Sequence, residues 1–539
     1  DDEEQRFLTR LSVFRGGFDR DAATIVAADG DRNRALNLLS ALVEKSLLNR
    51  EATGRYELHQ LLFQFAAEKL ASMATADGHD LAKSTKEEHS DYYCSWLSRQ
   101  QHDLRTRRDK RTLAAVEGDI ENIREAWRWA AREARTEYIT KALSGLGSFL
   151  DDRNWHQEGA ELLGFARDQL RLSAPDESIL LAQLSTWLAG FVGALGEIDE
   201  AESLVQNSLE LFREKGSKAD EAWALNGLGL VAAARGFLVE AAEYHEQSLT
   251  LYQQIGDDGG AAGQISQLGR IANERGQYER ARAMLNQALE MRRHLGDLPG
   301  VAGVLDALGF NAYRLGDAQA ASRYADEAIL IHESIGRRAG VANAIRLKGM
   351  VASLGGDYEQ AQRYYEEALA IRRDIGNRGA VGGSYTQLSH LALLTANYVA
   401  AKEYSLKCLD IAEEINNQWS MIYALNNLGL AQVRLGELDQ GRHSLLRALS
   451  IARDMNAGPL ALEILVGFAE LAVARKDNRR ALTLLCLVRD HPALISETWQ
   501  LAAPLYEMLV AASAANSQVD PCTSSRAVTL EMIMDELLD

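Results

Sequence analysis

The chain has 539 residues, and its 77 acidic and 58 basic side chains give a net charge of −19. Such an excess of negative charge disfavours general binding to nucleic acids and fits a well-solvated surface. No apolar run approaches the ~18 residues that a membrane-spanning helix needs, and no signal peptide opens the chain. The four cysteines lie far apart, without metal-ligand or redox spacing, so we expect a cytoplasmic protein in a reducing compartment.

The first 72 residues carry the pattern of a winged helix. Apolar residues at helical spacing predict helices over 3–14, 20–28 and 32–45, and the first of them is closed by Gly16-Gly17. Thr53-Gly54 then indicates a hairpin between two short strands. The strands are expected at 46–51 and 55–59, and a further helix at 60–71.

The third predicted helix is where many winged helices read DNA. A base-reading helix usually has a denser basic and amide face than this one. We therefore expect this domain to serve as a packing and switch element, and DNA binding stays an alternative. The polar side chains on this helix are Arg32, Arg34, Asn37, Glu44 and Lys45.

Residues 73–136 are predicted to be a helical linker. A long polar helix is expected over 79–112, and it ends in a basic cluster. That cluster fits a solvated linker or a surface that pairs with an acidic neighbour, with phosphate contact as the alternative. Its members are Arg105, Arg107, Arg108, Lys110 and Arg111.

The rest of the chain is organised by a 40-residue period. Gly276, Ala281 and Leu289 recur 40 residues earlier and later as a small residue, an alanine and an apolar residue. An unbroken period of this kind predicts stacked units, each made of two helices. We expect a degenerate first repeat at 137–178, repeats over 179–490 in a superhelix of roughly eight or nine units, and a helical cap at 491–539.

Glycines mark three places in each unit. A Leu-Gly pair inside the first helix, as in Leu268-Gly269, predicts close helix–helix approach, since glycine inside a helix costs about 1 kcal/mol against alanine. Gly276 falls where the first helix ends. Gly256-Asp257 is predicted to end the second helix and cap the next unit.

This spacing resembles the tetratricopeptide repeat, in the longer form of MalT-type activators and kinesin light chains. The segments 11–18, 41–48, 55–62 and 117–126 further resemble the winged helix and linker of bacterial STAND signal-transduction ATPases of the AfsR and MalT kind. The resemblance implies a mostly α protein: a winged helix, a linker and a tetratricopeptide sensor, following a P-loop ATPase domain. It also implies possible assembly into a homo-oligomer on activation.

The chemistry of that ATPase is missing from this chain. Its phosphate loop needs Gly-Lys, a dipeptide that occurs nowhere here. The chain also starts without an initiator methionine, so we expect the nucleotide-binding domain upstream and ATP or ADP only there. His245-Glu246 lacks the second histidine of a zinc helix, and no other set suggests catalysis or a metal site. We therefore expect no enzymatic activity in this chain.

The first helices of the repeats should line a concave groove. Counting from the Leu-Gly pair places arginines, amides and aromatic residues on that face, which packing alone does not require. Arginine pairs well with carboxylate or phosphate, and aromatic rings can stack on a ligand or clasp a peptide. The alternative is a hydrated groove with incidental charges. The candidate ligand-binding residues are Asn226, Arg270, Asn273, Asp306, Phe310, Tyr313, Arg314, Arg346, His390, Asn426 and Arg434.

These expectations define one main hypothesis and two alternatives. The main hypothesis is a sensor region that binds a protein, peptide or small effector in the groove and acts on the upstream nucleotide-binding domain through the winged helix. The alternatives are a free-standing scaffold that docks peptides and a DNA-binding transcriptional regulator.

Overall fold

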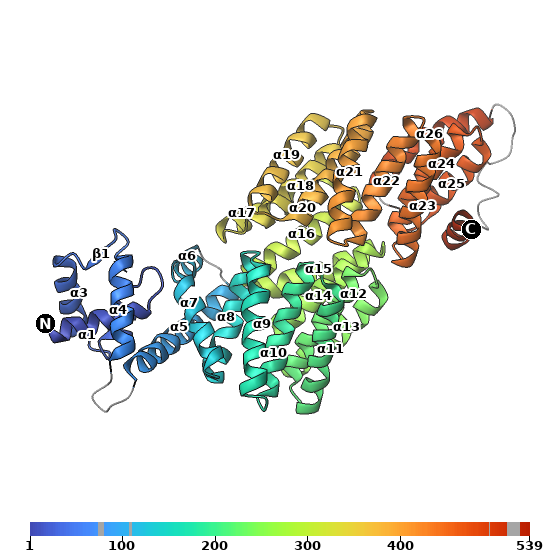
Figure 1. Cartoon of the computed structure of the whole chain (residues 1–539). Coiled ribbons are helices and arrows are strands. Elements are labelled where there is room, and N and C mark those ends of the chain that lie inside the picture. Colours follow the sequence, from blue (N-terminus) through green and yellow to red (C-terminus); the bar gives the residue numbers. More distant parts are fainter. Residues whose placement is uncertain (74–79, 107–109, 495, 515–528) are drawn as a thin grey trace. The chain divides into compact units, whose positions relative to one another are not determined.

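The computed structural model describes residues 1–73, 80–106, 110–494, 496–514 and 529–539 (Figure 1). The described chain is almost entirely helical, with one short hairpin. It divides into two compact units, the first made of 1–194 and 207–215 and the second of 195–206 and 216–539. None of the described helices is both long enough and apolar enough to cross a membrane.

Unit 1 begins with the predicted winged helix. Phe7, Leu11, Phe14 and Leu39 are buried together at the centre of its core. Asp1 caps the first helix and Asp31 caps the third. The elements are α1 (Asp2–Arg10), a 3-10 turn (Leu11–Val13), α2 (Arg20–Ala27), α3 (Arg32–Glu44), β1 (Leu48–Arg50), β2 (Tyr56–Leu58) and α4 (Gln60–Ser72).

The hairpin differs from the prediction in two ways. The first strand begins two residues later than expected, because Ser46 adopts a left-handed φ of 55° and Leu47 N–H still donates to the Leu42 carbonyl. In addition, Phe18 pairs with Tyr56 through reciprocal backbone hydrogen bonds of 3.0 and 2.8 Å. The residue after Gly16-Gly17 therefore extends the sheet, which the sequence pattern did not reveal.

The linker forms three helices: α5 (Leu81–Thr106), α6 (Lys110–Gly118) and α7 (Ile120–Arg132). The predicted helix over 79–112 corresponds to α5 and the start of α6, and residues 107–109 between them lie outside the described residues. The Asp80 carboxylate accepts from the backbone N–H groups of Ala82 and Lys83, which sets the start of α5. Of the predicted basic cluster, Arg107 and Arg108 lie outside the described residues.

A polar network ties the winged helix to α7. Arg55 forms a 2.6 Å ion pair with Asp119 and donates to the Gly17 carbonyl. Asn122 accepts from the Arg15 backbone N–H at 2.7 Å and donates to the same Gly17 carbonyl at 3.0 Å. Three segments far apart in the sequence therefore meet through side chains that the chain partly buries.

The repeats form consecutive pairs of helices, and within unit 2 successive pairs pack against each other (Figure 1). Their bounds are α8 (Thr136–Asp152), α9 (His156–Ser173), α10 (Ser178–Ala194), α11 (Ile198–Lys215), α12 (Lys218–Ala234), α13 (Leu238–Ile255), α14 (Asp258–Glu274), α15 (Tyr278–His294), α16 (Leu298–Arg314), α17 (Ala318–Ser334), α18 (Arg338–Leu354), α19 (Tyr358–Asp374), α20 (Arg378–Leu394), α21 (Tyr398–Glu414), α22 (Gln418–Arg434), α23 (Leu438–Asp454), α24 (Gly458–Ala474) and α25 (Asn478–Asp490).

The predicted roles of the glycines are confirmed. A Cβ on Gly269 would lie 2.8 Å from the Leu285 side chain, and one on the equivalent Gly349, which follows Lys348, would lie 2.6 Å from the Tyr365 ring, so these glycines let the two helices of a unit approach closely. Gly276 has a φ of 76° at the end of its helix, and Asp257 accepts from the Gly260 N–H at 2.8 Å as a cap. The structure adds a further role, because Gly260 and the equivalent Gly340 lie directly beneath buried side chains of the preceding helix.

The C-terminal region packs onto the last repeat. It comprises α26 (Ser496–Ala514) and α27 (Leu530–Leu538), and Ile533 and Met534 of α27 are buried in the core that α23–α25 share. Arg480 forms a 2.7 Å ion pair with Glu536. Pro521, the predicted break, lies outside the described residues. Cys486 takes part in a disulfide, whereas we expected free thiols throughout the chain.

The close approach at Gly349 gives a stability test. Gly349→Ala should destabilise unit 2 by about 1–3 kcal/mol, because the added methyl group meets the buried Tyr365 ring. Gly383→Ala in α20 is the matched control: it meets no atom within 4 Å, so helix propensity should stabilise it by up to about 1 kcal/mol. Urea unfolding followed by far-UV circular dichroism measures both, and equal effects would contradict the close-approach role.

A buried histidine gives a pH test. His89 in α5 is 2% exposed, and burial, together with the charge of Arg15, lowers its pKa to about 4, against a hydrogen bond to Asn122 that raises it. Between about pH 6.5 and pH 4, the unfolded chain therefore binds a proton at His89 that the folded chain does not bind. This contribution to stability is full above about pH 6.5 and is lost as the pH falls to about 4, a change of roughly 3 kcal/mol.

His89→Gln should remove that part of the acid sensitivity, whereas His443→Gln at an exposed position should retain it. The readout is the urea dependence of labelling at the buried Cys94 thiol by dithiodipyridine, in a Cys408→Ala background. An unchanged acid profile in His89→Gln would assign the sensitivity to other groups.

Candidate functional site

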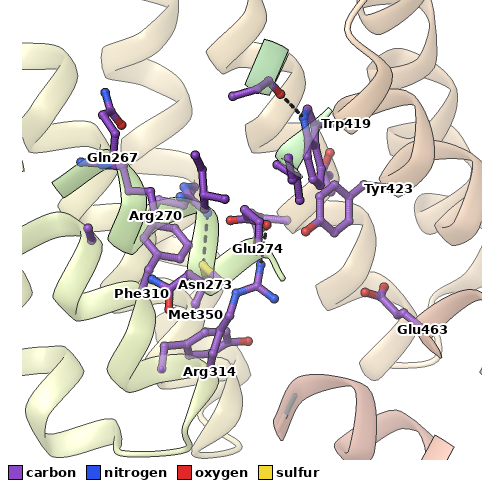
Figure 2. Close-up of a pocket in the computed structure, with 18 of the residues that line it drawn as sticks. Gln267, Arg270, Asn273, Glu274, Phe310, Arg314, Met350, Trp419, Tyr423 and Glu463 are labelled. Atoms are coloured by element: carbon purple, nitrogen blue, oxygen red, sulfur yellow. Dashed lines mark hydrogen bonds and ion pairs between the residues drawn. The ribbon is translucent and has the colours of Figure 1, made fainter. Parts of the chain in front are cut away.

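Unit 2 contains a cavity of about 520 Å³ that is partly open to solvent. The size is that of a typical small-ligand site. Its walls come mainly from first helices of the repeats, α12, α14, α16, α18, α20, α22 and α24, so the cavity lies on the predicted groove face. Figure 2 shows arginine, amide and aromatic side chains from these helices pointing toward a common space.

Seven of the eleven predicted residues line this cavity, so helix periodicity alone located most of the face. They come from α14, α16, α18 and α20. The seven are Arg270, Asn273, Phe310, Tyr313, Arg314, Arg346 and His390.

The other four predicted residues lie outside the lining and bond to side chains of other helices. Asn226 accepts from Gln264 at 3.1 Å, and Asp306 lies 3.1 Å from the Nε2 of the buried His332. Asn426 is buried and donates to Glu463. Arg434 forms a bidentate pair with Glu470 at 2.6 and 2.8 Å. These four residues therefore have a structural role in joining helices, and their role in ligand binding stays a prediction.

Several lining residues were not predicted. Trp419 and Tyr423 lie early in α22, at positions that the count from the Leu-Gly pair does not select. Glu463 comes from α24, where the repeat pattern weakens, and His245 comes from a second helix. These side chains reach the cavity because repeats far apart in the chain meet around it, which no local periodicity encodes.

One wall of the cavity is cationic. The Arg346 guanidinium lies 4.4 Å from the centre of the Phe310 ring and donates to the Met350 sulfur at 3.2 Å. Behind it in α19 lies Arg372, which is 3% exposed. Burial, reinforced by the charge of Arg346, lowers the pKa of Arg372 to about 9.

In the interior of the cavity, positive and negative side chains lie close together. Arg314 lies 3.8 Å from the Glu274 carboxylate. Burial lowers the pKa of Arg314, but the charge of Glu274 and the Tyr423 hydroxyl outweigh it, so the net shift is upward and the guanidinium stays charged. The same burial raises the pKa of Tyr423 and keeps its hydroxyl protonated.

A third group supplies negative charge from the other end of the lining. Glu463 is 6% exposed and accepts from Asn426 at 2.9 Å. Arg270 is exposed and donates to the Gly303 carbonyl at 2.5 Å. The site can thus bind carboxylate or phosphate at one wall, stack on planar groups and accept hydrogen bonds from donors at Glu463.

Across the described residues, no group of histidine, cysteine or acidic side chains is arranged to hold a metal ion.

Basic side chains of α3, the helix that commonly reads DNA in winged helices, form ion pairs with acidic side chains of the same domain. Arg34 of α3 pairs with Glu3 at 2.7 Å and with Asp29 at 3.0 Å. Lys45, just after α3, pairs with Glu4 at 2.6 Å. Glu3 and Glu4 of α1, together with Asp29, therefore neutralise two of the cations that a phosphate backbone would need.

Comparisons with known families agree with this architecture. Residues 1–71 match a winged helix-turn-helix domain family. Tetratricopeptide repeat families match residues 180–254, 220–294, 261–334, 300–374 and 422–455. The chain therefore consists of an N-terminal winged helix with a small hairpin, followed by stacked tetratricopeptide repeats.

Related proteins carry a regulatory name. Proteins of Mycobacterium tuberculosis and Mycobacterium bovis named "Putative HTH-type transcriptional regulator" are 31% identical to this chain over 252 residues. The match covers 42% of this chain and 26% of each relative. The chain therefore spans about a quarter of the length of these curated relatives.

Two solved structures show similar helical folds. A STAND protein with a tetratricopeptide repeat sensor from Pyrococcus horikoshii has a TM-score of 0.38 and 17% identity, over 96% of this chain and 64% of that chain. A Rap protein complexed with Competence and Sporulation Factor has a TM-score of 0.48 and 14% identity, over 68% of this chain and 97% of that one. Similarity at this level says nothing about ligand or activity.

Proposed function

We propose that this chain is the sensor region of a bacterial STAND-type signalling protein and binds a short peptide or a similarly compact effector in the cavity of unit 2. The observation that carries the proposal is the cavity itself. Stacked repeats need apolar contacts, yet here arginine, amide and aromatic side chains of successive first helices converge on one concave space. Convergent polar groups in a concave pocket are typical of ligand sites.

The proposed output runs through unit 1 to a nucleotide-binding domain outside this chain. The Arg55–Asp119 pair and Asn122 hold the winged helix on α7, so the two can move as one body. A ligand that prefers one arrangement of the sensor would then shift the population of the switch. In this proposal, ATP or ADP and any catalytic activity belong to that other domain, and this chain contributes binding alone.

A free-standing peptide scaffold would use the same cavity without a nucleotide switch. The two proposals share the site and differ in the neighbour, so the full-length gene product decides between them. If peptide binding is unaffected by nucleotide in the full-length protein, the scaffold proposal stands and the switch fails.

Ligand binding should depend on the arginines that line the cavity. The double variant Arg314→Glu/Arg346→Glu should weaken retention of ligands at least about tenfold, because it reverses two charges that face the site. The probe is an equimolar pentapeptide library with free carboxyl termini, read by equilibrium dialysis and mass spectrometry. Arg282→Glu/Arg363→Glu changes the net charge equally at exposed positions and should bind like the unchanged protein.

Two results would count against the proposed site. Equal losses in both double variants would point to net charge rather than the cavity. Retention of peptides by the Arg314→Glu/Arg346→Glu variant at the unchanged level would place binding elsewhere on the chain.

A second candidate function is DNA binding, which the winged-helix match and the names of the mycobacterial relatives favour. The ion pairs of Arg34 and Lys45 oppose it. Titration of a fluorescent 30-base-pair duplex at 50 mM and 200 mM salt tests it, with Glu3→Gln/Glu4→Gln as the variant that releases Lys45 and removes one of the two acidic partners of Arg34. We expect weak binding by the unchanged chain and a gain in the variant; tight, sequence-selective binding by the unchanged chain would favour the DNA-binding function.

A further inference from the structure

Three helix-end glycines of unit 2 touch residues more than five repeats away. Gly196, Gly236 and Gly276 occupy the same place in successive repeats. A Cβ on Gly196 would lie 3.1 Å from the Ile415 carbonyl oxygen. The corresponding distances are 2.6 Å from Gly236 to the Met455 side chain and 2.7 Å from Gly276 to the Ala493 methyl group.

Two equivalent glycines elsewhere in the repeat array make no such contact. Gly356 and Gly436 have the same left-handed backbone, with φ of 81° and 84°, but a Cβ on either would meet no atom within 4 Å. The turn alone therefore explains glycine at these two positions. At Gly236 and Gly276 a second constraint operates, because one stretch of the repeat array approaches another.

Hydrogen bonds reinforce the same approach. The Tyr278 hydroxyl donates to the Ala493 carbonyl at 3.3 Å, and the Trp419 indole N–H donates to the Ala233 carbonyl at 3.4 Å. We call this set of contacts the seam: Gly196 with Ile415, Gly236 with Met455, Gly276 and Tyr278 with Ala493, and Ala233 with Trp419.

The seam forms one wall of the cavity. Ala233 and Trp419 bond to each other across the seam, and both line the cavity. Figure 2 shows Trp419 directed toward the repeat that faces it, with its hydrogen bond drawn. Separation of the two stretches would break this bond and remove that wall, so the state of the seam decides how far the cavity is open to solvent.

We propose that the repeat array of unit 2 closes on itself at the seam and encloses its ligand, opening there for entry and release. This rests on the proposed function, which it deepens in two respects. It limits the ligand to a compact molecule that fits about 520 Å³, such as a few-residue peptide, and excludes a folded protein domain. It also makes closure the step through which the ligand acts.

The charged and polar side chains on the two sides of the seam are suited to a ligand that bridges it. Arg270, Arg314 and Arg346 belong to helices α14–α18, whereas Tyr423 and Glu463 belong to α22 and α24. A ligand that reaches groups of both sets makes all its contacts only when the seam is closed. Its binding energy therefore favours the closed state over the open one.

The test measures the seam without any ligand. Nitroxide labels are placed on the full chain at Glu240→Cys and Asp454→Cys, which are exposed and flank the contact between Gly236 and Met455. Electron paramagnetic resonance then gives the distribution of distances between them. We expect a single short-distance population in the labelled parent and a longer one in Gly236→Ala/Gly276→Ala, whose added methyl groups hold the seam apart.

Gly356→Ala/Gly436→Ala is the matched control. It imposes the same backbone strain without any contact, so its distances should equal those of the parent. Tyr278→Phe is a milder second variant that removes only the hydroxyl, and it should add a minor longer-distance population. A short distance retained in both Gly236→Ala/Gly276→Ala and Tyr278→Phe, or equal widening in the two glycine pairs, would overturn the proposal.

Ligand affinity separates this inference from the proposed function. If closure encloses the ligand and the closed population falls about tenfold, the apparent Kd for the retained pentapeptides should rise about tenfold in Gly236→Ala/Gly276→Ala, and not in the control pair. Unchanged affinity with a widened seam would overturn enclosure while the proposed site stands. Absence of any retained peptide, with the seam closing as expected, would instead remove the proposed function.

Discussion

Unit 2 depends on one repeated contact, the close approach of neighbouring helices at a glycine of the first helix that most of its repeats share. At Gly349 the helix surface is open enough to receive the Tyr365 ring, and at Gly269 the same place receives Leu285. Because this contact recurs every 40 residues, each unit adds a similar rotation to the last. The concave face, the cavity and the distant contacts of the seam all follow from that accumulated rotation.

Local chemistry made most of the fold predictable. The left-handed glycine at 276 and the Asp257 cap are set by neighbours within one turn of helix, so the sequence alone predicts both. The errors occurred where a distant partner decides. Phe18 joins the hairpin only because Tyr56 offers its backbone, and Gly260 is small because Tyr252 lies across it. Such requirements have no periodic signature.

The predicted and the unpredicted residues of the site differ in the same way. Arg270, Phe310, Arg314 and Arg346 were predicted because each faces inward from its own helix. Trp419 and Glu463 were not, because they enter the cavity only after the array has coiled far enough to face itself. Periodicity within a repeat thus defines one face of the cavity, whereas its closure depends on the pitch of the whole array, which small rotations at each unit determine.

The distribution of charge argues that this interior is more than a by-product of coiling. In a chain of net charge −19, Arg372 is buried and donates to the neutral oxygens of Asn343, Ala380 and Ser384, and to no carboxylate in the described part of the chain. Burial of a cation without a carboxylate partner is costly, and the repeat does not require it, since Tyr252 fills the equivalent place elsewhere. Arg372 stands behind Arg346, where its charge adds to the attraction for an anionic group. A ligand that brings such a group into the cavity would offset part of that cost, which links the least favourable side chain of the core to the proposed binding site.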